Sequence, residues 1–130
     1  MEPLEPAPLL TTDQEEIIVH WAKLHADKLR AVLLYGSRLT GHRRQKDKPT
    51  PVPDIDLALS IGGRDEDRFT TFAINKPLWS AFLVSQLGVS VDFNSADPDI
   101  GPTVAGFLLS GEYKVLWYDP ERWSPAMVWG

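Results

Sequence analysis

Apolar and polar residues follow each other along the chain in a rhythm that predicts a small β-sheet. Residues 31–35 form a short apolar run, and residues 54–61 alternate strictly between polar and apolar side chains. Residues 89–93 alternate in the same way, and residues 113–118 add an edge strand. Side chains in a strand point alternately to the two faces of a sheet, so each alternating run predicts one polar face and one apolar face.

Helical spacing of apolar residues separates these strands. We expect a first helix over residues 13–28, opened by a capping-box pattern at Thr12 and Glu15. Residues 64–87 are also mostly helical, but we expect a break near residues 75–77, because the proline there lacks an N–H.

A short helix carrying Val104 and Leu108 is predicted to end at Gly111. Helices that alternate with strands indicate an α/β (α+β) fold, in which helices cover a small sheet.

The strand over residues 54–61 places two carboxylates on one face. Asp54 and Asp56 share that face with Ala58 and Ser60, whereas the other face is apolar. Asp92 lies on the polar side of the later strand. Neighbouring carboxylates repel each other, and a divalent cation between them removes that cost; oxygen ligands suit Mg²⁺. Two such ions are the usual requirement for phosphoryl or nucleotidyl transfer.

Gly36 and Ser37 follow the apolar run and supply the complementary part of such a site. A glycine at a strand end allows close approach of the backbone to a phosphate, and a serine at the start of a helical turn offers a hydroxyl and N–H groups. Arg38 adds positive charge, and Gly41 ends the turn.

Composition limits the remaining choices. The 130 residues suffice for one domain, and a formal net charge of −5 argues against broad nucleic-acid binding. Without cysteine the chain has no disulfide and no thiol chemistry. No apolar run approaches the length of a membrane span, and the first residues lack the pattern of a signal peptide, so we expect a cytoplasmic protein.

These residues, in this order, resemble the DNA polymerase β-type nucleotidyltransferase superfamily. The resemblance rests on Gly36-Ser37, Gly41, Asp54-Ile-Asp56 and Asp92, and it covers roughly residues 32–118. By its size the chain is most similar to the minimal nucleotidyltransferases. The resemblance implies a nucleotidyltransferase fold with a small mixed sheet packed by helices.

The resemblance also implies a role for each site residue. Asp54 and Asp56 would each contact two Mg²⁺ ions, with Mn²⁺ as a substitute, and Asp92 would ligate the catalytic metal and help deprotonate the attacking hydroxyl. Gly36 and Ser37, with Arg38 nearby, would hold the phosphates of ATP or another NTP. A nucleoside monophosphate, AMP in the case of ATP, would then pass to a hydroxyl of an acceptor.

The resemblance further implies a partner. The domain is expected to span residues 12–118, between a proline-rich arm (1–11) and an aromatic tail (119–130), and it leaves no room for a separate acceptor-binding domain. In the minimal family the partner is often a small helical protein of the HEPN type, paired as toxin and antitoxin. A homo-oligomer is the other expectation, and the arm and tail are candidate docking surfaces.

Other interpretations remain open at this point. The Asp-x-Asp pattern is also found at ordinary solvent-facing strand edges, and Asp92 can begin a turn with Asn94 and Asp97, itself a candidate cap or turn residue. A non-catalytic module that binds a nucleotide or a partner would have the same fold. Modification of a small molecule is a third interpretation, but it requires a pocket that the sequence does not reveal.

The segment between Ser37 and Asp54 is longer than is usual in the minimal family. It carries Arg43, Arg44, Lys46 and Lys48. We interpret it as a solvated loop, although it is also basic enough to lean over a triphosphate and attract it.

Overall fold

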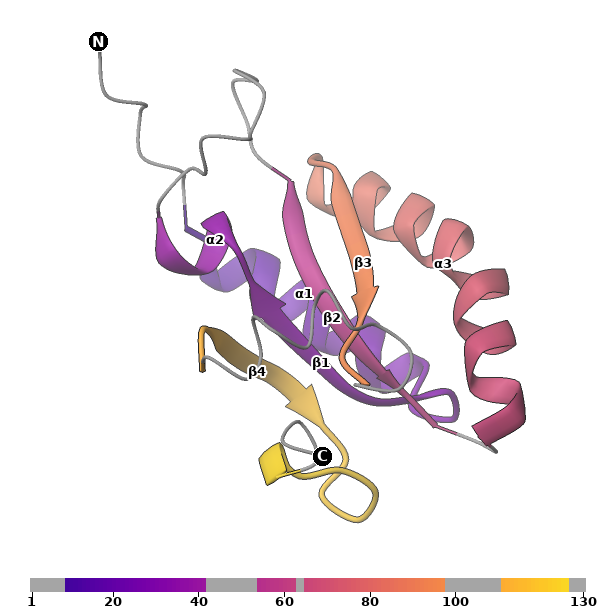
Figure 1. The fold of residues 1–130 in the computed structure, drawn as a ribbon. Helices are drawn as coiled ribbons and strands as arrows, with labels where there is room; N and C mark the ends of the chain where they lie inside the picture. Colours follow the sequence, from indigo (N-terminus) through magenta and orange to yellow (C-terminus); the bar gives the residue numbers. More distant parts are fainter. Residues whose placement is uncertain (1–8, 42–53, 63–64, 98–110, 127–130) are drawn as a thin grey trace, which may run out of the picture.

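The computed structural model describes residues 9–41, 54–62, 65–97 and 111–126, and these form a four-stranded sheet with two long helices against it (Figure 1). In chain order the elements are α1 (Thr12–Leu24), β1 (Leu29–Tyr35), α2 (Ser37–Thr40), β2 (Ile55–Ile61), α3 (Asp65–Leu87), β3 (Val91–Ser95) and β4 (Tyr113–Tyr118). None of the helices in these ranges is long and apolar enough to cross a membrane.

The sheet is mixed, as expected. Its strand order is β3-β2-β1-β4. The inner strand β1 is antiparallel to β2 and to β4, whereas β2 and β3 are parallel and are joined through α3. A parallel pair needs such a crossover connection, because the chain must return to the same end of the sheet.

The two faces of the sheet have different coverings. The inner face packs on α1 and α3 through a large apolar cluster that includes Trp21, Trp79 and Phe93. The apolar residues of β2 at positions 55, 57, 59 and 61 all belong to this cluster, as the alternation predicts. A smaller cluster on the opposite face contains Ala58 and Trp123. The polar positions of β2 and β3 therefore lie on the face opposite this helix-covered cluster.

Helix α1 differs from the prediction at both of its ends. The capping box uses Thr11 and Gln14 rather than Thr12 and Glu15: the Thr11 hydroxyl accepts from the Gln14 N–H at 3.1 Å, and the Gln14 side chain accepts from the Thr11 N–H at 3.0 Å. The helix ends at Leu24 rather than at residue 28, because a turn closed on the His25 carbonyl leads directly into β1.

Helix α3 is continuous, and the predicted break near residues 75–77 is wrong. Pro77 lies inside the helix. A proline removes the hydrogen bond to the carbonyl four residues earlier, which here belongs to Ala73. Both residues are exposed, so solvent can satisfy that carbonyl and the helix continues.

Strand β3 begins at Val91, two residues later than predicted, although its faces are as expected. Gly88, with φ of +74°, follows the last turn of α3. The next two residues carry the chain to the level of Ile55, whose N–H bonds to the Ser90 carbonyl at 2.9 Å. Edge strand β4 has the predicted bounds, and the predicted helix before Gly111 lies outside the described residues.

The first part of the predicted tail packs onto the sheet. Trp123 is buried and lies against Tyr118, with ring centroids 5.8 Å apart. The Asp119 N–H donates to the Arg30 carbonyl at 2.9 Å, so the chain continues along β1 beyond β4. Most of the proline-rich arm and the last four residues lie outside the described ranges, and the predicted division of the chain stays a prediction.

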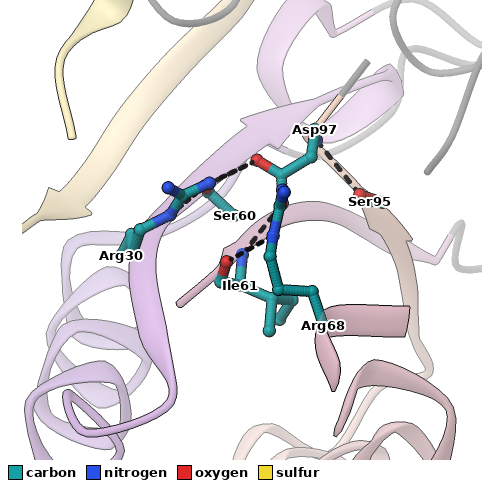
Figure 2. A network of polar contacts seen from close by, with 6 residues as sticks. All are labelled: Arg30, Ser60, Ile61, Arg68, Ser95 and Asp97. Carbon is teal, nitrogen blue, oxygen red and sulfur yellow. Dashed lines mark hydrogen bonds and ion pairs between the residues drawn. The ribbon is translucent and has the colours of Figure 1, made fainter. Parts of the chain in front are cut away.

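A buried carboxylate joins β1, β2, α3 and the end of β3 (Figure 2). Asp97 pairs with Arg68 at 2.6 Å and with Arg30 at 3.1 Å. It also accepts hydrogen bonds from the Ser60 hydroxyl at 2.7 Å and from the Ile61 N–H at 3.1 Å. Asp97, which lies in a bend after β3, is therefore also an interior charge at the centre of a polar network, a role that its sequence context does not suggest.

We predict that Asp97→Asn lowers the free energy of unfolding by about 3–5 kcal/mol, because Arg68 and Arg30 keep their charges and lose the anion between them. Urea unfolding measures the change. Asp119→Asn is the matched control: its pair with Arg122 is more exposed, and a loss below about 1 kcal/mol is expected there. Equal small losses in both variants would contradict the assigned role of Asp97.

His25 gives the folded protein a dependence on pH. Its ring lies 5.8 Å from the rings of both Trp21 and Trp79, centroid to centroid. Burial lowers the pKa of His25, the charge of Lys28 lowers it further, and Asp27 acts in the opposite direction. The neutral ring is thus favoured in the folded state.

The sign of the pH effect follows from this shift. Between the lowered pKa and the ordinary histidine value of about 6.5, the unfolded chain binds more protons than the folded one. The contribution of His25 to stability is complete above that value and declines as the pH falls below it. Thermal unfolding from pH 7.5 to pH 5 should therefore show a steeper loss for the natural protein than for His25→Gln. Parallel profiles would refute the assignment.

Candidate active site

Two of the three predicted acids lie side by side on neighbouring strands. In the parallel register of β2 and β3, Asp56 is the partner of Asp92. Adjacent strands are about 4.8 Å apart, so the two backbones lie well within the reach of shared ligation. Asp54 precedes β2 by one residue and lies one pleat away from Asp56 on the same face. Asp54 and Asp92 are exposed, and Asp56 is partly buried.

Asp92 lies inside β3, so the alternative interpretation, in which Asp92 begins a turn, is wrong. A residue that begins a turn would leave the sheet, whereas Asp92 pairs with β2 and the strand continues to Ser95. The strand alternation also places Asp92 on the face opposite Val91 and Phe93, which belong to the apolar core.

The glycine–serine turn lies at the same end of the sheet. Since β1 is antiparallel to β2, its last residue, Tyr35, is the partner of Asp56. Gly36 follows with φ of 80° and ψ of −157°, a conformation that is essentially restricted to glycine. The Gly36 carbonyl accepts from the N–H groups of Leu39 and Thr40 at 3.0 and 3.1 Å and so starts the single turn of α2.

The side chains after Gly36 are less accessible than a phosphate ligand would suggest. Ser37 is 4% exposed and Arg38 is 3% exposed. Burial lowers the pKa of the Arg38 guanidinium, and the negative charge of Asp54 partly opposes that effect. Arg38 therefore supplies positive charge to the acidic strand. Its carbonyl also accepts from the Leu10 N–H at 3.1 Å, which ties the residues before α1 to this turn.

The donor set fits Mg²⁺ in its chemistry and in its backbone placement. Within the described ranges, however, no three acidic or histidine side chains are gathered closely enough to hold an ion. The exposed carboxylates of Asp54 and Asp92 can turn toward Asp56 without disturbing the core, because neither is packed in it. The arrangement is thus a set of neighbouring acids on a common face that an arriving cation can draw together.

Asn94 is a site residue that the sequence interpretation missed. It follows Asp92 by two positions and so shares its face, and its side-chain amide contacts both Asp92 and the Tyr35 hydroxyl. The spacing to Asp92 was the available signal, but nothing in the sequence indicates the contact with β1. The basic segment with Arg43, Arg44, Lys46 and Lys48 lies outside the described residues, so neither the solvated loop nor the alternative contact with a triphosphate is tested.

Comparison with known proteins supports the fold. No family model matches the chain, and no curated protein matches it. Five chains of solved structures do, among them the following two. One is a toxin–antitoxin MntA–HpeT mutant with two Asp-to-Glu substitutions two positions apart (TM-score 0.53, 18% identity). The other is a toxin–antitoxin with AMP-PNP (TM-score 0.53, 19% identity). In both, the match covers 82% of this chain and 75% of the other. The chain therefore shares its fold, a mixed sheet packed by helices, with these two structures.

Proposed function

We propose that this protein is a nucleotidyltransferase that moves a nucleoside monophosphate, AMP from ATP in the simplest case, onto a hydroxyl of an acceptor. The observation that carries the proposal is the register of β2 and β3, which makes Asp56 and Asp92 partners beside the turn at Gly36. Carboxylates and a close backbone approach are the two features that such a reaction demands of a protein.

The reaction itself requires little covalent chemistry from the chain. The acceptor oxygen attacks the α-phosphorus, the bond from that phosphorus to the α–β bridging oxygen breaks, and pyrophosphate leaves. The hydroxyl proton passes to a base, for which Asp92 is our candidate because it is exposed at the edge of the acid pair. Two Mg²⁺ ions, once bound, neutralise the charge that develops on the phosphate oxygens.

The other residues have binding and orienting roles in this scheme. Asp54 and Asp56 hold the ions, and the backbone N–H groups after Gly36 face the β- and γ-phosphates. Ser37 and Arg38 are buried, so we assign Arg38 to the charge balance of Asp54 as well as to phosphate attraction. The proposed division of roles places metal and phosphate at one end of the sheet.

The acceptor is proposed to be a partner protein. Two of the matching solved structures are toxin–antitoxin systems, one of them with AMP-PNP. By analogy, we propose that this chain acts as the antitoxin and modifies a small helical partner of the HEPN type. Residues altered in one of those structures are two aspartates with the same spacing as Asp54 and Asp56, which supports the assignment of this pair.

A non-catalytic nucleotide- or partner-binding module is the second candidate. It is favoured by one observation: among the described side chains, three acids are not gathered around a common point. Such a module would bind a nucleotide through the turn at Gly36 and would not need the acids. The role of divalent ions therefore separates the two candidates.

We predict Mg²⁺-dependent labelling of the partner protein by [α-³²P]ATP. The expected partner is a small helical protein of the HEPN type, to be sought among the products of the neighbouring genes. Label from the α-phosphate must appear on the partner, and label from [γ-³²P]ATP must not, because pyrophosphate leaves. Asp54→Asn and Asp56→Asn should each reduce labelling by at least about a hundredfold, the scale of loss when a group that stabilises the transition state is removed.

Asp67→Asn serves as the matched control, since Asp67 is an exposed acid on α3. Its labelling should equal that of the natural protein. Binding of AMP-PNP that is indifferent to Mg²⁺, together with no labelling, would favour the non-catalytic module. Labelling that survives both asparagine substitutions would remove the proposed acids from the reaction.

We also predict that Gly36→Ala impairs both folding and nucleotide binding. A side chain at this φ and ψ costs about 1–3 kcal/mol in strain, and it also stands between the backbone and a phosphate. Urea unfolding and AMP-PNP titration measure the two effects. Gly88→Ala is the comparison, because Gly88 also has positive φ but a Cβ there meets nothing within 4 Å. Gly88→Ala should lose some stability and no nucleotide affinity; equal nucleotide losses would refute the assignment of Gly36.

A further inference from the structure

Asn94 bridges two strands that are not neighbours. Its side-chain Nδ2 donates to the Tyr35 hydroxyl on β1 at 2.7 Å. The same nitrogen donates to the Asp92 Oδ2 on β3, at a longer 3.4 Å. In the strand order β2 lies between β3 and β1, so this amide passes over β2 to make the first bond.

The residue below the bridge allows this crossing. Asn94 is the register partner of Ala58 on β2, and Ala58 is fully buried. A methyl group at this position leaves room above β2, whereas any longer side chain would occupy the path between Asn94 and Tyr35. Two positions before Ala58 on β2, and on the same face, Asp56 lies between Asp92 and Tyr35 in the sheet.

Tyr35 gives the bridge a fixed end. It is 4% exposed and packs in the smaller apolar cluster with Leu33 and Trp123. A buried aromatic side chain has few rotamers available, so its hydroxyl holds the amide in one place. Asp92, in contrast, is exposed, and among its described contacts the amide of Asn94 is the one that restrains its carboxylate.

We propose that Asn94 is a positioning residue that holds the Asp92 carboxylate toward Asp56 for shared ligation of a divalent cation. The proposal rests on the proposed function, because it assumes that these acids bind metal. A neutral amide suits this role, because it orients one carboxylate oxygen by a hydrogen bond and leaves the negative charge for the cation. Groups that orient metal ligands in this way typically contribute tenfold or more to metal affinity.

Tyr35 takes part in the same function through Asn94. Without the phenol oxygen, the amide loses its shorter hydrogen bond and is free to turn away from Asp92. Loss of the hydroxyl and loss of the amide should then have one and the same consequence. A purely structural role of either residue would instead give independent effects, which follow the stability of each variant rather than the geometry of the site.

A double-mutant cycle on Mn²⁺ affinity tests the proposal. Free Mn²⁺ is measured by electron paramagnetic resonance with the natural protein, Asn94→Ala, Tyr35→Phe and the double variant, each first shown by thermal unfolding to be folded. We expect about a tenfold weaker affinity in each single variant and no further loss in the double variant, since both changes break one bridge. Tyr118→Phe is the control. It removes the hydroxyl of an exposed tyrosine at the end of β4 that lies away from Tyr35.

The outcomes of the cycle separate the positioning role of Asn94 from the metal site itself. Tight binding by the natural protein and by all variants would overturn the role of Asn94 while leaving the proposed metal site intact. Losses that multiply in the double variant would also overturn it, since they indicate independent effects. If the natural protein itself binds no Mn²⁺, both the proposed metal site and the positioning role of Asn94 are refuted. Should Asn94→Ala fail to fold, Tyr35→Phe keeps the ring packing and carries the test alone.

Discussion

The parallel pairing of β2 with β3 is the constraint on which the site depends. Side chains in a strand change face at every residue, so a slip of one position would turn Asp92 into the apolar core and bring Val91 or Phe93 to the polar face. The helix-covered face prevents such a slip, because Phe93 is fully buried between α1 and α3. The hydrophobic core thereby fixes the pairing of two carboxylates that it does not itself contact.

At the end of the sheet opposite the acids, an ion-pair network restrains the parallel strands β2 and β3. Asp97, two residues beyond β3, accepts from the Ile61 N–H at the end of β2 and pairs with Arg68 on α3 (Figure 2). This network therefore joins both parallel strands to the helix that connects them. In some proteins a buried ion pair adds little to stability but favours one unique arrangement of the chain. Here the Asp97 network restrains the register of β2 and β3 at one end of the sheet, and the acids lie at the other end.

Hydrophobic alternation made the faces of β2 and β3 predictable, and with them the shared face of Asp56 and Asp92. Contacts between distant residues were not predictable in the same way. Asp97 looked like a turn residue because a proline follows it, and only the fold brings two arginines to it. The helix through Pro77 shows the same limit, since tertiary packing of Trp79 and Leu83 outweighs the local cost of the proline.

Repulsion among the three acids is relieved by different means at the two sides of the site. On one side the buried guanidinium of Arg38 attracts Asp54, and its charge partly cancels that of the carboxylate. On the other side Asn94 gives Asp92 a hydrogen bond without a charge. Asp56 lies between them, next to Asp92 in the sheet and one pleat from Asp54. The amide leaves the charge of Asp92 in place, so under the proposed function Asp92 would keep its attraction for a cation, whereas Asp54 would exchange part of its attraction to Arg38 for the same ion.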